Sequence, residues 1–266
     1  MTEEQKVVYG TQGYLVVEGA FAPDELARVR AVFDRAAGDG GLGDLPNRDD
    51  VFVRLAEHPT VFPVVHRILG DDVQLRALQG MTIAPGGAGK GWHREVAGML
   101  GVDHPASTVC VQVVFHLDDV AEDGACVSVV PGSHRFKPGL GFPEIARIEE
   151  MPHHVALRVK AGTAVVLHGN LWQARTRNRS ETPQRFLAYA YVHCWMRQAL
   201  PELSAHAVKV ASSTHNLAQL FGLVISHRDA RGYWGRKVEG YTPSTGLPER
   251  HFSGLKVVGK GVVPNR

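Results

Sequence analysis

The sequence predicts a mostly β protein, a β-sandwich or double-sheet barrel that carries helices at one edge. Two observations predict it: helical patterns fill residues 22–70, and short β-like runs separated by Gly and Pro turns fill residues 72–195. Helices followed by many short strands are typical of this architecture. The 266 residues show no internal repeat, linker or break in composition, so we expect one domain over residues 1–266.

The first elements are a strand and two helices. "GYLVVEGAF" (residues 13–21) is a short apolar strand candidate. The helix after it begins near Asp24 and ends at the glycines of residues 38–43. One face of this helix is marked at helical spacing by Leu26, Val29, Arg30 and Phe33. A second helix is expected in "PTVFPVVHRILG", where Gly70 ends it.

The β core is expected over about 72–195, after helices over about 22–70. Its strands are expected in "VQLRALQGMTIA", "STVCVQVVFHLDDV", "CVSVVPGSH", "HVALRVKAGTAVVLH" and "RFLAYAYVHCW". A C-terminal extension over 200–266 follows, with one short helix in "THNLAQLFGLVISH" and a Gly- and Pro-rich remainder.

The bulk composition favours a small-molecule protein over a nucleic-acid or membrane protein. A formal charge of +2 gives no electrostatic reason for either partner, and no run approaches the ~20 apolar residues of a membrane span. The three cysteines have no CxxC spacing, and the N-terminus has no signal-peptide pattern, so we expect reduced thiols in a cytoplasmic protein. The sequence leaves a homodimer open.

The first polar cluster is "GKGWHREVAGM". His93 and Glu95 are two residues apart, which on an extended segment places both side chains on one face. An imidazole and a carboxylate on one face suit the two-histidine, one-carboxylate arrangement that binds Fe(II). The pair alone is weak evidence, and a surface ion pair of Arg94 and Glu95 beside a structural His93 is the alternative.

The second cluster is "VVFHLDDVAEDGACVSVVPGSHRF". Gln112 and His116 share one face of a strand, so both are candidates to point into a pocket. The ordinary alternative is a hydrogen-bonded strand histidine. The acids of residues 118–123 are interpreted as a solvated loop, and His134 as part of a tight turn.

The third cluster is "VVLHGNLWQARTRNRS" (residues 165–180), followed by Arg185 at the start of an apolar strand. His168 and Gln173 are its two candidates for chemistry. The guanidinium of Arg185 is able to bind a carboxylate with two hydrogen bonds, although a surface arginine at a strand start is equally compatible with the pattern.

Together these segments resemble the phytanoyl-CoA dioxygenase family of Fe(II)- and 2-oxoglutarate-dependent oxygenases. The resemblance extends from "GYLVVEGAFAPDELARVR" to about Tyr191 and rests on "GWHREV", "HLDDVAEDGACVSVVPGSHRF" and "AGTAVVLHGNLWQARTRNRS". It implies a double-stranded β-helix, or jelly roll, and Fe(II) and 2-oxoglutarate as cofactors.

The resemblance also implies a metal site. His93 matches the first ligand, and Glu95 stands where aspartate is usual. Gln173 falls on the third ligand position, where the family has histidine. His168 matches an upstream histidine that is not a ligand, and Asn178 matches the asparagine of the pattern.

The cosubstrate site is implied in the same way. An arginine about eleven residues after the third ligand holds the distal carboxylate of 2-oxoglutarate in the family. Arg185 lies one residue beyond that position and is the implied anchor. Arg175 replaces a small residue that helps to bind the cosubstrate, and Gln112 is a further candidate from its place on the pocket-facing side of its strand.

Gln173 leaves three functional hypotheses, because an amide oxygen is a poorer donor for Fe(II) than an imidazole. The first is Fe(II)/2-oxoglutarate-dependent oxidation of a small molecule, such as a bacterial secondary metabolite, with a metal on His93, Glu95 and Gln173. The second is an iron-independent isomerase, cyclase or lyase that uses His93, Glu95, His116 or His168 for acid–base chemistry. The third is a non-catalytic binding protein. The retained His93, Glu95 and Arg185 favour the first.

Overall fold

The computed structural model describes residues 1–38, 42–95, 108–137, 140–224, 255–258 and 261–264. Its core consists of two sheets with antiparallel pairing throughout. The major sheet has the order β1-β7-β4-β9-β2. Its strands are β1 (Tyr14–Val17), β7 (Ala164–His168), β4 (Cys110–His116), β9 (Gln184–His193) and β2 (Val73–Ile83).

The minor sheet lies opposite the major sheet and has the order β3-β8-β5-β6. Its strands are short: β3 (Lys90–His93), β8 (Gln173–Arg175), β5 (Val127–Val129) and β6 (Val155–Leu157). Side chains from both sheets, such as Val114 and Val129, pack together in one apolar cluster between them. This is the double-stranded β-helix that the resemblance implies, and all five predicted β runs contain strands.

Alternation along β9 separates the two faces of the major sheet. Phe186 and Ala188 point into the space between the sheets. Leu187, Tyr189 and Tyr191 point to the opposite side and belong to a second apolar cluster with the helices. The sequence "RFLAYAYV" therefore builds two cores at once, one on each face of a single strand.

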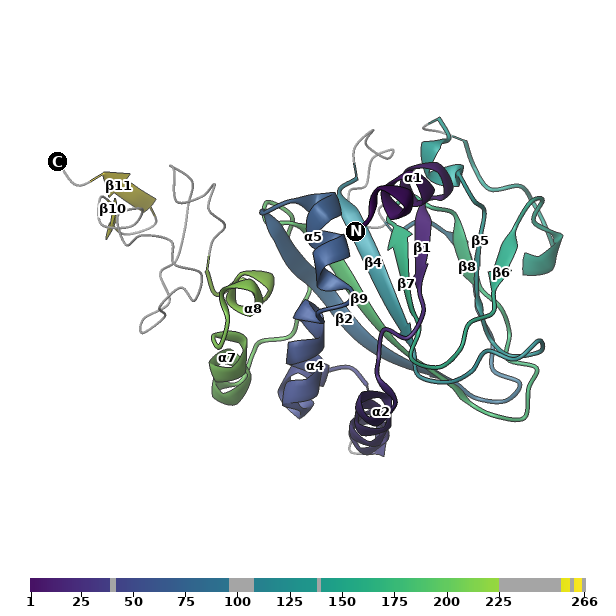
Figure 1. The fold of residues 1–266 in the computed structure, drawn as a ribbon, viewed down its shortest axis with the longest axis horizontal. Coiled ribbons are helices and arrows are strands. Elements are labelled where there is room, and N and C mark those ends of the chain that lie inside the picture. Colours follow the sequence, from purple (N-terminus) through teal and green to yellow (C-terminus); the bar gives the residue numbers. More distant parts are fainter. Residues whose placement is uncertain (39–41, 96–107, 138–139, 225–254, 259–260, 265–266) are drawn as a thin grey trace.

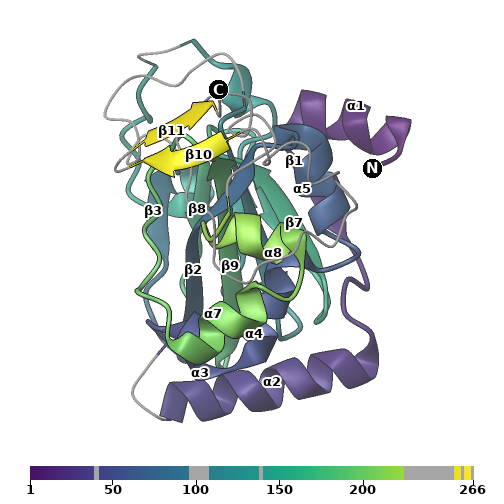
Figure 2. The same cartoon turned by 90° about the vertical axis from the view of Figure 1, so that its left-hand side faces the viewer.

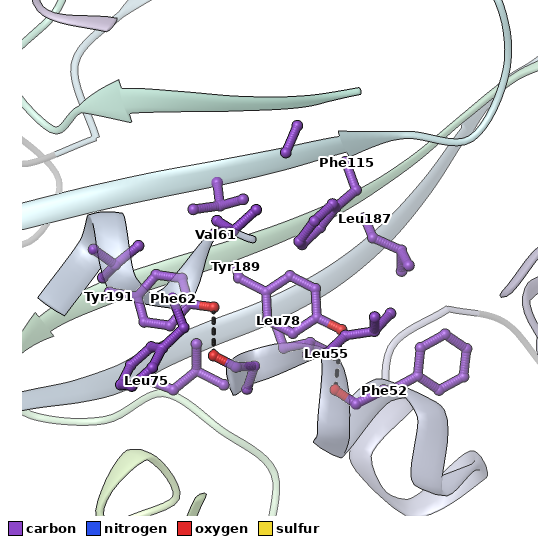
Figure 3. Packing of buried hydrophobic residues seen from close by; sticks show 14 of the residues in the cluster. Phe52, Leu55, Val61, Phe62, Leu75, Leu78, Phe115, Leu187, Tyr189 and Tyr191 are labelled. Atoms are coloured by element: carbon purple, nitrogen blue, oxygen red, sulfur yellow. Dashed lines mark hydrogen bonds between the residues drawn. The ribbon is translucent and has the colours of Figure 1, made fainter. Parts of the chain in front are cut away.

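Helices cover the outer face of the major sheet (Figure 1). They are α2 (Pro23–Gly38), α3 (Leu45–Arg48), α4 (Asp50–Arg54), the 3₁₀ turn Leu55–Glu57 and α5 (Phe62–Leu69). Tyr189 and Tyr191 donate their hydroxyl hydrogens to the carbonyl oxygens of Phe52 (3.0 Å) and Ala56 (2.9 Å), as Figure 3 shows. Each buried hydroxyl thus has a partner, and each bond fixes the helices to the sheet.

Two further helices, α7 (Ala205–Ala211) and α8 (His215–Leu220), lie beside α4 and β2 (Figure 2). The sequence predicted only the second of them. Residues 225–254 of the expected C-terminal extension lie outside the described residues. Beyond them, β10 (Leu255–Val258) and β11 (Gly261–Pro264) form an antiparallel pair.

A helix that the sequence reading did not anticipate, α1 (Glu3–Gln12), precedes β1. Its local signals are nevertheless present: Thr2 and Gln5 form a reciprocal capping box, and Gly13 ends the helix at φ 83°. Only Tyr9 of this helix is buried, so it has almost no apolar periodicity to detect. None of the described helices is both long and apolar enough to cross a membrane.

Candidate active site

The three predicted metal ligands lie close together where β3 pairs with β8. His93 lies directly opposite Gln173 in this strand pair. The Nε2 atom of His93 is 3.2 Å from Oε1 of Glu95, two residues further along the chain. His93 and Glu95 are both partly buried, and Gln173 is only 4% exposed. The strand pairing thus places an imidazole, a carboxylate and an amide in one small region.

The hydrogen bond of His93 Nδ1 determines whether Nε2 of the same ring carries a hydrogen or a lone pair. Nδ1 lies 2.8 Å from the carbonyl oxygen of Gly91. Because a carbonyl oxygen only accepts hydrogen bonds, Nδ1 carries the proton in this contact and Nε2 of a neutral ring presents a lone pair. Nε2 then faces another lone-pair donor, the Glu95 carboxylate, and it donates to that carboxylate when the ring gains a second proton. A proton or a metal cation stabilises such a pair.

Glu95 is held as a carboxylate by its neighbours. Burial alone raises its pKa, but the hydrogen bond with His93 and the charge of Lys90 outweigh that effect, so the pKa lies below its ordinary value. Lys90 Nζ is 3.7 Å from Oε1, and Gln112 Nε2 donates to the same oxygen over 3.3 Å. Arg94 instead lies over the Phe142 ring, at 5.8 Å, so the surface pair of Arg94 and Glu95 does not form.

Arg175 follows Gln173 by two residues on β8 and also points between the sheets. Its guanidinium carbon is 5.4 Å from the centre of the Phe186 ring, and Nη1 contacts the Met81 sulfur at 3.1 Å. Nε of Arg175 and Nε2 of Gln173 are buried without hydrogen-bond partners among the described residues. Burial lowers the pKa of Arg175, while the charge of Glu95 opposes that shift. An inward cation with an unpaired donor is suited to an anionic ligand.

His116 shares the inward face of β4 with Gln112, as the strand alternation predicted. It is completely buried, its ring meets Phe186 edge-on at 5.2 Å, and neither ring nitrogen has a partner among the described residues. Burial lowers its pKa to about 4, and the charge of Arg175 contributes in the same direction. His116 is therefore a neutral imidazole at physiological pH.

A cavity of about 280 Å³ lies beside Glu95 and Gln112. Its other lining residues are Arg76, Ala77, Gln79, Ala188, Ala190 and Ala199. None of these six residues was predicted from the sequence. One signal was present, because two inward positions of "FLAYAYV" on β9, residues 188 and 190, are alanines, whereas the outward positions are large. The small side chains leave space between the sheets.

Arg185 is separated from this group, contrary to the expectation that it faces the pocket. Its guanidinium donates to both oxygens of Asp34 (2.7 Å each) and, through Nε and Nη2, to Asp118 (3.0 and 2.6 Å). The residue eleven positions after Gln173 is Gln184, which is 2% exposed and donates to the carbonyl of Asp119. Adjacent strand residues face opposite sides, so the one-residue displacement turns Arg185 towards α2.

The remaining candidates have structural contacts. His168 Nε2 meets the Thr108 hydroxyl at 2.9 Å, and its Nδ1 accepts the backbone N–H of Asn170. His134 lies beside α1, with Nε2 3.3 Å from the Gly10 carbonyl. Asn178 donates to the Ile83 and Thr182 carbonyls and so holds the turn before β9.

The described residues contain no cluster of three His, Cys, Asp or Glu side chains with metal-binding geometry. A metal on His93 and Glu95 would need a third ligand, and Gln173, which pairs with His93 across β3 and β8, is a candidate for it. Amide oxygens do bind divalent metals, although less tightly than imidazole binds Fe(II). The side chains fit a divalent metal of reduced affinity.

Comparison with known proteins gives one family and several relatives. The sequence profile of "Phytanoyl-CoA dioxygenase (PhyH)" matches residues 9–186. L-proline trans-4-hydroxylase of Streptomyces griseoviridis is 21% identical over 228 residues, covering 71% of this chain and 85% of that protein.

Two solved structures have the same fold. The non-heme α-ketoglutarate-dependent carbocyclase SnoK of nogalamycin biosynthesis superposes with a TM-score of 0.62 at 18% identity, over 73% of this chain and 84% of that one. HygX of Streptomyces hygroscopicus, with nickel, 2-oxoglutarate and hygromycin B bound, gives 0.60 at 20% identity, over 74% and 90%.

Proposed function

Since this chain belongs to the phytanoyl-CoA dioxygenase family, we propose that it is an Fe(II)- and 2-oxoglutarate-dependent enzyme that oxidises a small molecule in the cavity beside Glu95. One observation carries the proposal: the lone pair of His93 Nε2 faces the Glu95 carboxylate at 3.2 Å, next to the cavity. The relatives include a hydroxylase, a carbocyclase and a protein with hygromycin B bound. We extend the proposal to tailoring of a biosynthetic intermediate on that basis.

The metal is held by His93, Glu95 and the amide oxygen of Gln173. Glu95 has a lowered pKa, so at neutral pH it binds a cation without first losing a proton. The contact between His93 Nδ1 and the Gly91 carbonyl fixes the ring and would leave Nε2 free to bind the metal. When bound, Fe(II) and 2-oxoglutarate would supply the electrons that reduce and activate O2, the oxidant for attack on a C–H bond.

The distal carboxylate of 2-oxoglutarate pairs with Arg175 in this proposal, and not with Arg185. Arg175 points between the sheets, has an unpaired buried donor and lies on the same strand as Gln173. Arg185 already has two carboxylate partners on the outer face. The buried Phe186 and the uncharged His116 lie beside this region and exclude water from it, which strengthens the ion pair.

The test is anaerobic titration of the whole protein with Fe(II) and 2-oxoglutarate, watching the visible charge-transfer band of the chelate. We expect a band with weak metal affinity in the wild type. Gln173→His should tighten metal binding by more than about 10–100-fold, which is the scale of changes in residues that only support a metal ligand. Absence of a band, together with absence of bound metal by elemental analysis at saturating iron, would contradict the proposal.

The two arginines provide a matched pair for the cosubstrate. Arg175→Gln should abolish the 2-oxoglutarate-dependent band while metal binding persists. Arg185→Gln should leave the band of the folded protein unchanged. If Arg185→Gln abolishes the band and Arg175→Gln does not, Arg185 is the residue that binds the distal carboxylate.

A second candidate function is acid–base chemistry without iron, such as isomerisation, cyclisation or elimination. It is favoured by the neutral amides of Gln173 and Gln184, which occupy the two positions where the family has a ligand and an anchor. This function predicts an activity that persists in a chelator and without oxygen and that is lost in Glu95→Ala. An activity abolished by the chelator would exclude it.

A further inference from the structure

An irregularity in β2 directs an arginine into the cavity. The pairing of β2 with β9 shifts between Leu75 and Ala77, so Arg76 is an extra residue without a partner on β9. Leu75 and Leu78 both pack into the cluster beneath the helices. The two residues between them, Arg76 and Ala77, both line the cavity. A β-bulge places consecutive side chains on one face in this way, and bulges are frequent beside active sites.

The bulge is fixed by the segment after β9. The backbone N–H of Ala199 donates to the Arg76 carbonyl over 2.8 Å, and Nη1 of Arg76 donates to the Arg197 carbonyl. Both contacts are with neutral backbone groups. Among the residues that the structure describes, no carboxylate lies within ion-pair distance of Arg76, which is partly buried. Within the described part of the chain, its charge thus has no ion-pair partner on the cavity side.

The other lining residues contribute one further charge and two amides. Four alanines form an apolar surface, Gln79 and Gln112 supply amide groups, and Glu95 is the single carboxylate of the described lining. Glu95 already has His93 and Lys90 as partners. The charges of Glu95 and Arg76 both act on the buried Cys110 thiol. Burial raises its pKa to about 12, the charge of Glu95 adds to this shift, and the charge of Arg76 opposes it. Arg76 and Glu95 thus lie at the same end of the barrel.

We propose that the substrate is a small organic acid whose carboxylate pairs with Arg76, whose carbon skeleton lies against Ala188 and Ala190, and whose reacting carbon faces Glu95. This inference deepens the proposed function and rests on it for the reaction, although not for the binding. A carboxylate fits because Nη1 of Arg76 is already partly engaged, and the remaining guanidinium edge matches one carboxylate with two hydrogen bonds. A volume of about 280 Å³ is at the lower end for ligand sites and favours a molecule of amino-acid size.

The test uses two probes of equal shape, cyclohexanecarboxylate and cyclohexanecarboxamide, with calorimetric titration of the whole protein. Saturating 2-oxoglutarate is included so that Arg175 is occupied. We expect the wild type to bind the carboxylate about tenfold or more tightly than the amide, the scale of a desolvated charge-assisted hydrogen bond. Arg76→Gln should remove this preference, and Arg76→Lys should keep a weaker one because the charge remains without the planar fork.

Arg197→Gln is the matched control, because it removes the same charge from an exposed neighbour that does not line the cavity. It should keep the preference of the wild type. Equal binding of both probes by the wild type, or an undiminished preference in Arg76→Gln, would overturn the inference.

A further arm separates this inference from the proposed function. If 2-oxoglutarate does not bind at all but Arg76 still determines the carboxylate preference, the binding inference stands and the proposed oxidation fails. If 2-oxoglutarate binds and Arg175→Gln abolishes the carboxylate preference while Arg76→Gln keeps it, the organic acid binds at the cosubstrate position and the inference is wrong.

Discussion

His93 and Gln173 show how individual side chains set the chemistry of this site. The Gly91 carbonyl fixes the proton of His93 on Nδ1, so Nε2 is available as a ligand. Gln173 lies directly opposite, but its neutral amide is a weaker donor than the family's histidine. In the proposed metal site, His93 is therefore a well-oriented ligand and Gln173 a weak one.

The burial of His116 also makes the stability of the folded protein depend on pH. Its pKa in the folded protein is about 4, against an ordinary value of 6.5, because burial disfavours the charged ring. The unfolded chain thus binds more protons between these values, and stability falls as the pH drops from about 6.5 to 4. We expect this histidine to account for about 3 kcal/mol of that loss.

The measurement is denaturant unfolding of the wild type and His116→Leu at pH 7 and at pH 4. The variant should lose about 3 kcal/mol less than the wild type over this range. Parallel losses in the two proteins would show that His116 is solvated or paired in the folded state.

At the scale of the strand, alternation on β9 decides the role of each residue. Gln184 and Phe186 point inward, whereas Arg185 points outward and joins β9 to Asp34 of α2 and to Asp118. A displacement by one position along a strand therefore turns a ligand-binding residue into a structural one. Burial lowers the pKa of Arg185, but its hydrogen bond to Asp118 has the larger effect and raises it, consistent with a permanent cation.

Arg185→Gln should lower the free energy of unfolding by about 1–3 kcal/mol, because the partly buried Asp118 then keeps, among the described residues, only Arg30 at 3.7 Å as a cation partner. Arg35→Gln removes an exposed pair with Asp49 and should cost less than about 1 kcal/mol. Chemical unfolding of both variants gives the comparison. Equal, small losses would mean that the outer-face ion pairs do not hold α2 to the sheet.

For the molecule as a whole, the helical layer is fixed to the major sheet by buried tyrosines. Tyr191 is 1% exposed, and its hydroxyl donates to the carbonyl of Ala56 in the 3₁₀ turn after α4. Tyr191→Phe removes the donor and leaves this carbonyl without its bond inside the core. We expect a loss of about 1–3 kcal/mol in unfolding free energy with an unchanged dependence on denaturant.

Tyr14→Phe is the control for this substitution, since the Tyr14 side chain is partly exposed on β1. Its effect should stay within about 0.5 kcal/mol, as for surface changes in general. A loss in Tyr191→Phe no larger than in Tyr14→Phe would show that the helical layer does not depend on this bond.

The sequence by itself determined the β core, α2 and α5, and the pairing of His93 with Glu95 on one face. These features follow from local periodicity and from residues two apart on an extended segment, which need no knowledge of distant segments. The alanines on the inward face of β9 were readable from the same alternation. The capping signals of α1 are also local, but without a stripe of apolar residues at helical spacing they did not suffice to predict this helix.

Only the tertiary structure decided which arginine faces the interior. From the sequence, Arg185 was the implied anchor and Arg175 a replacement of a small cosubstrate-binding residue. Strand pairing turns Arg185 outward and Arg175 inward. The place of Arg76 was equally hidden, because a bulge is defined by the register between β2 and β9 and not by either strand alone. Register and side-chain direction are properties of paired strands, and they exist only once segments far apart in the chain have met.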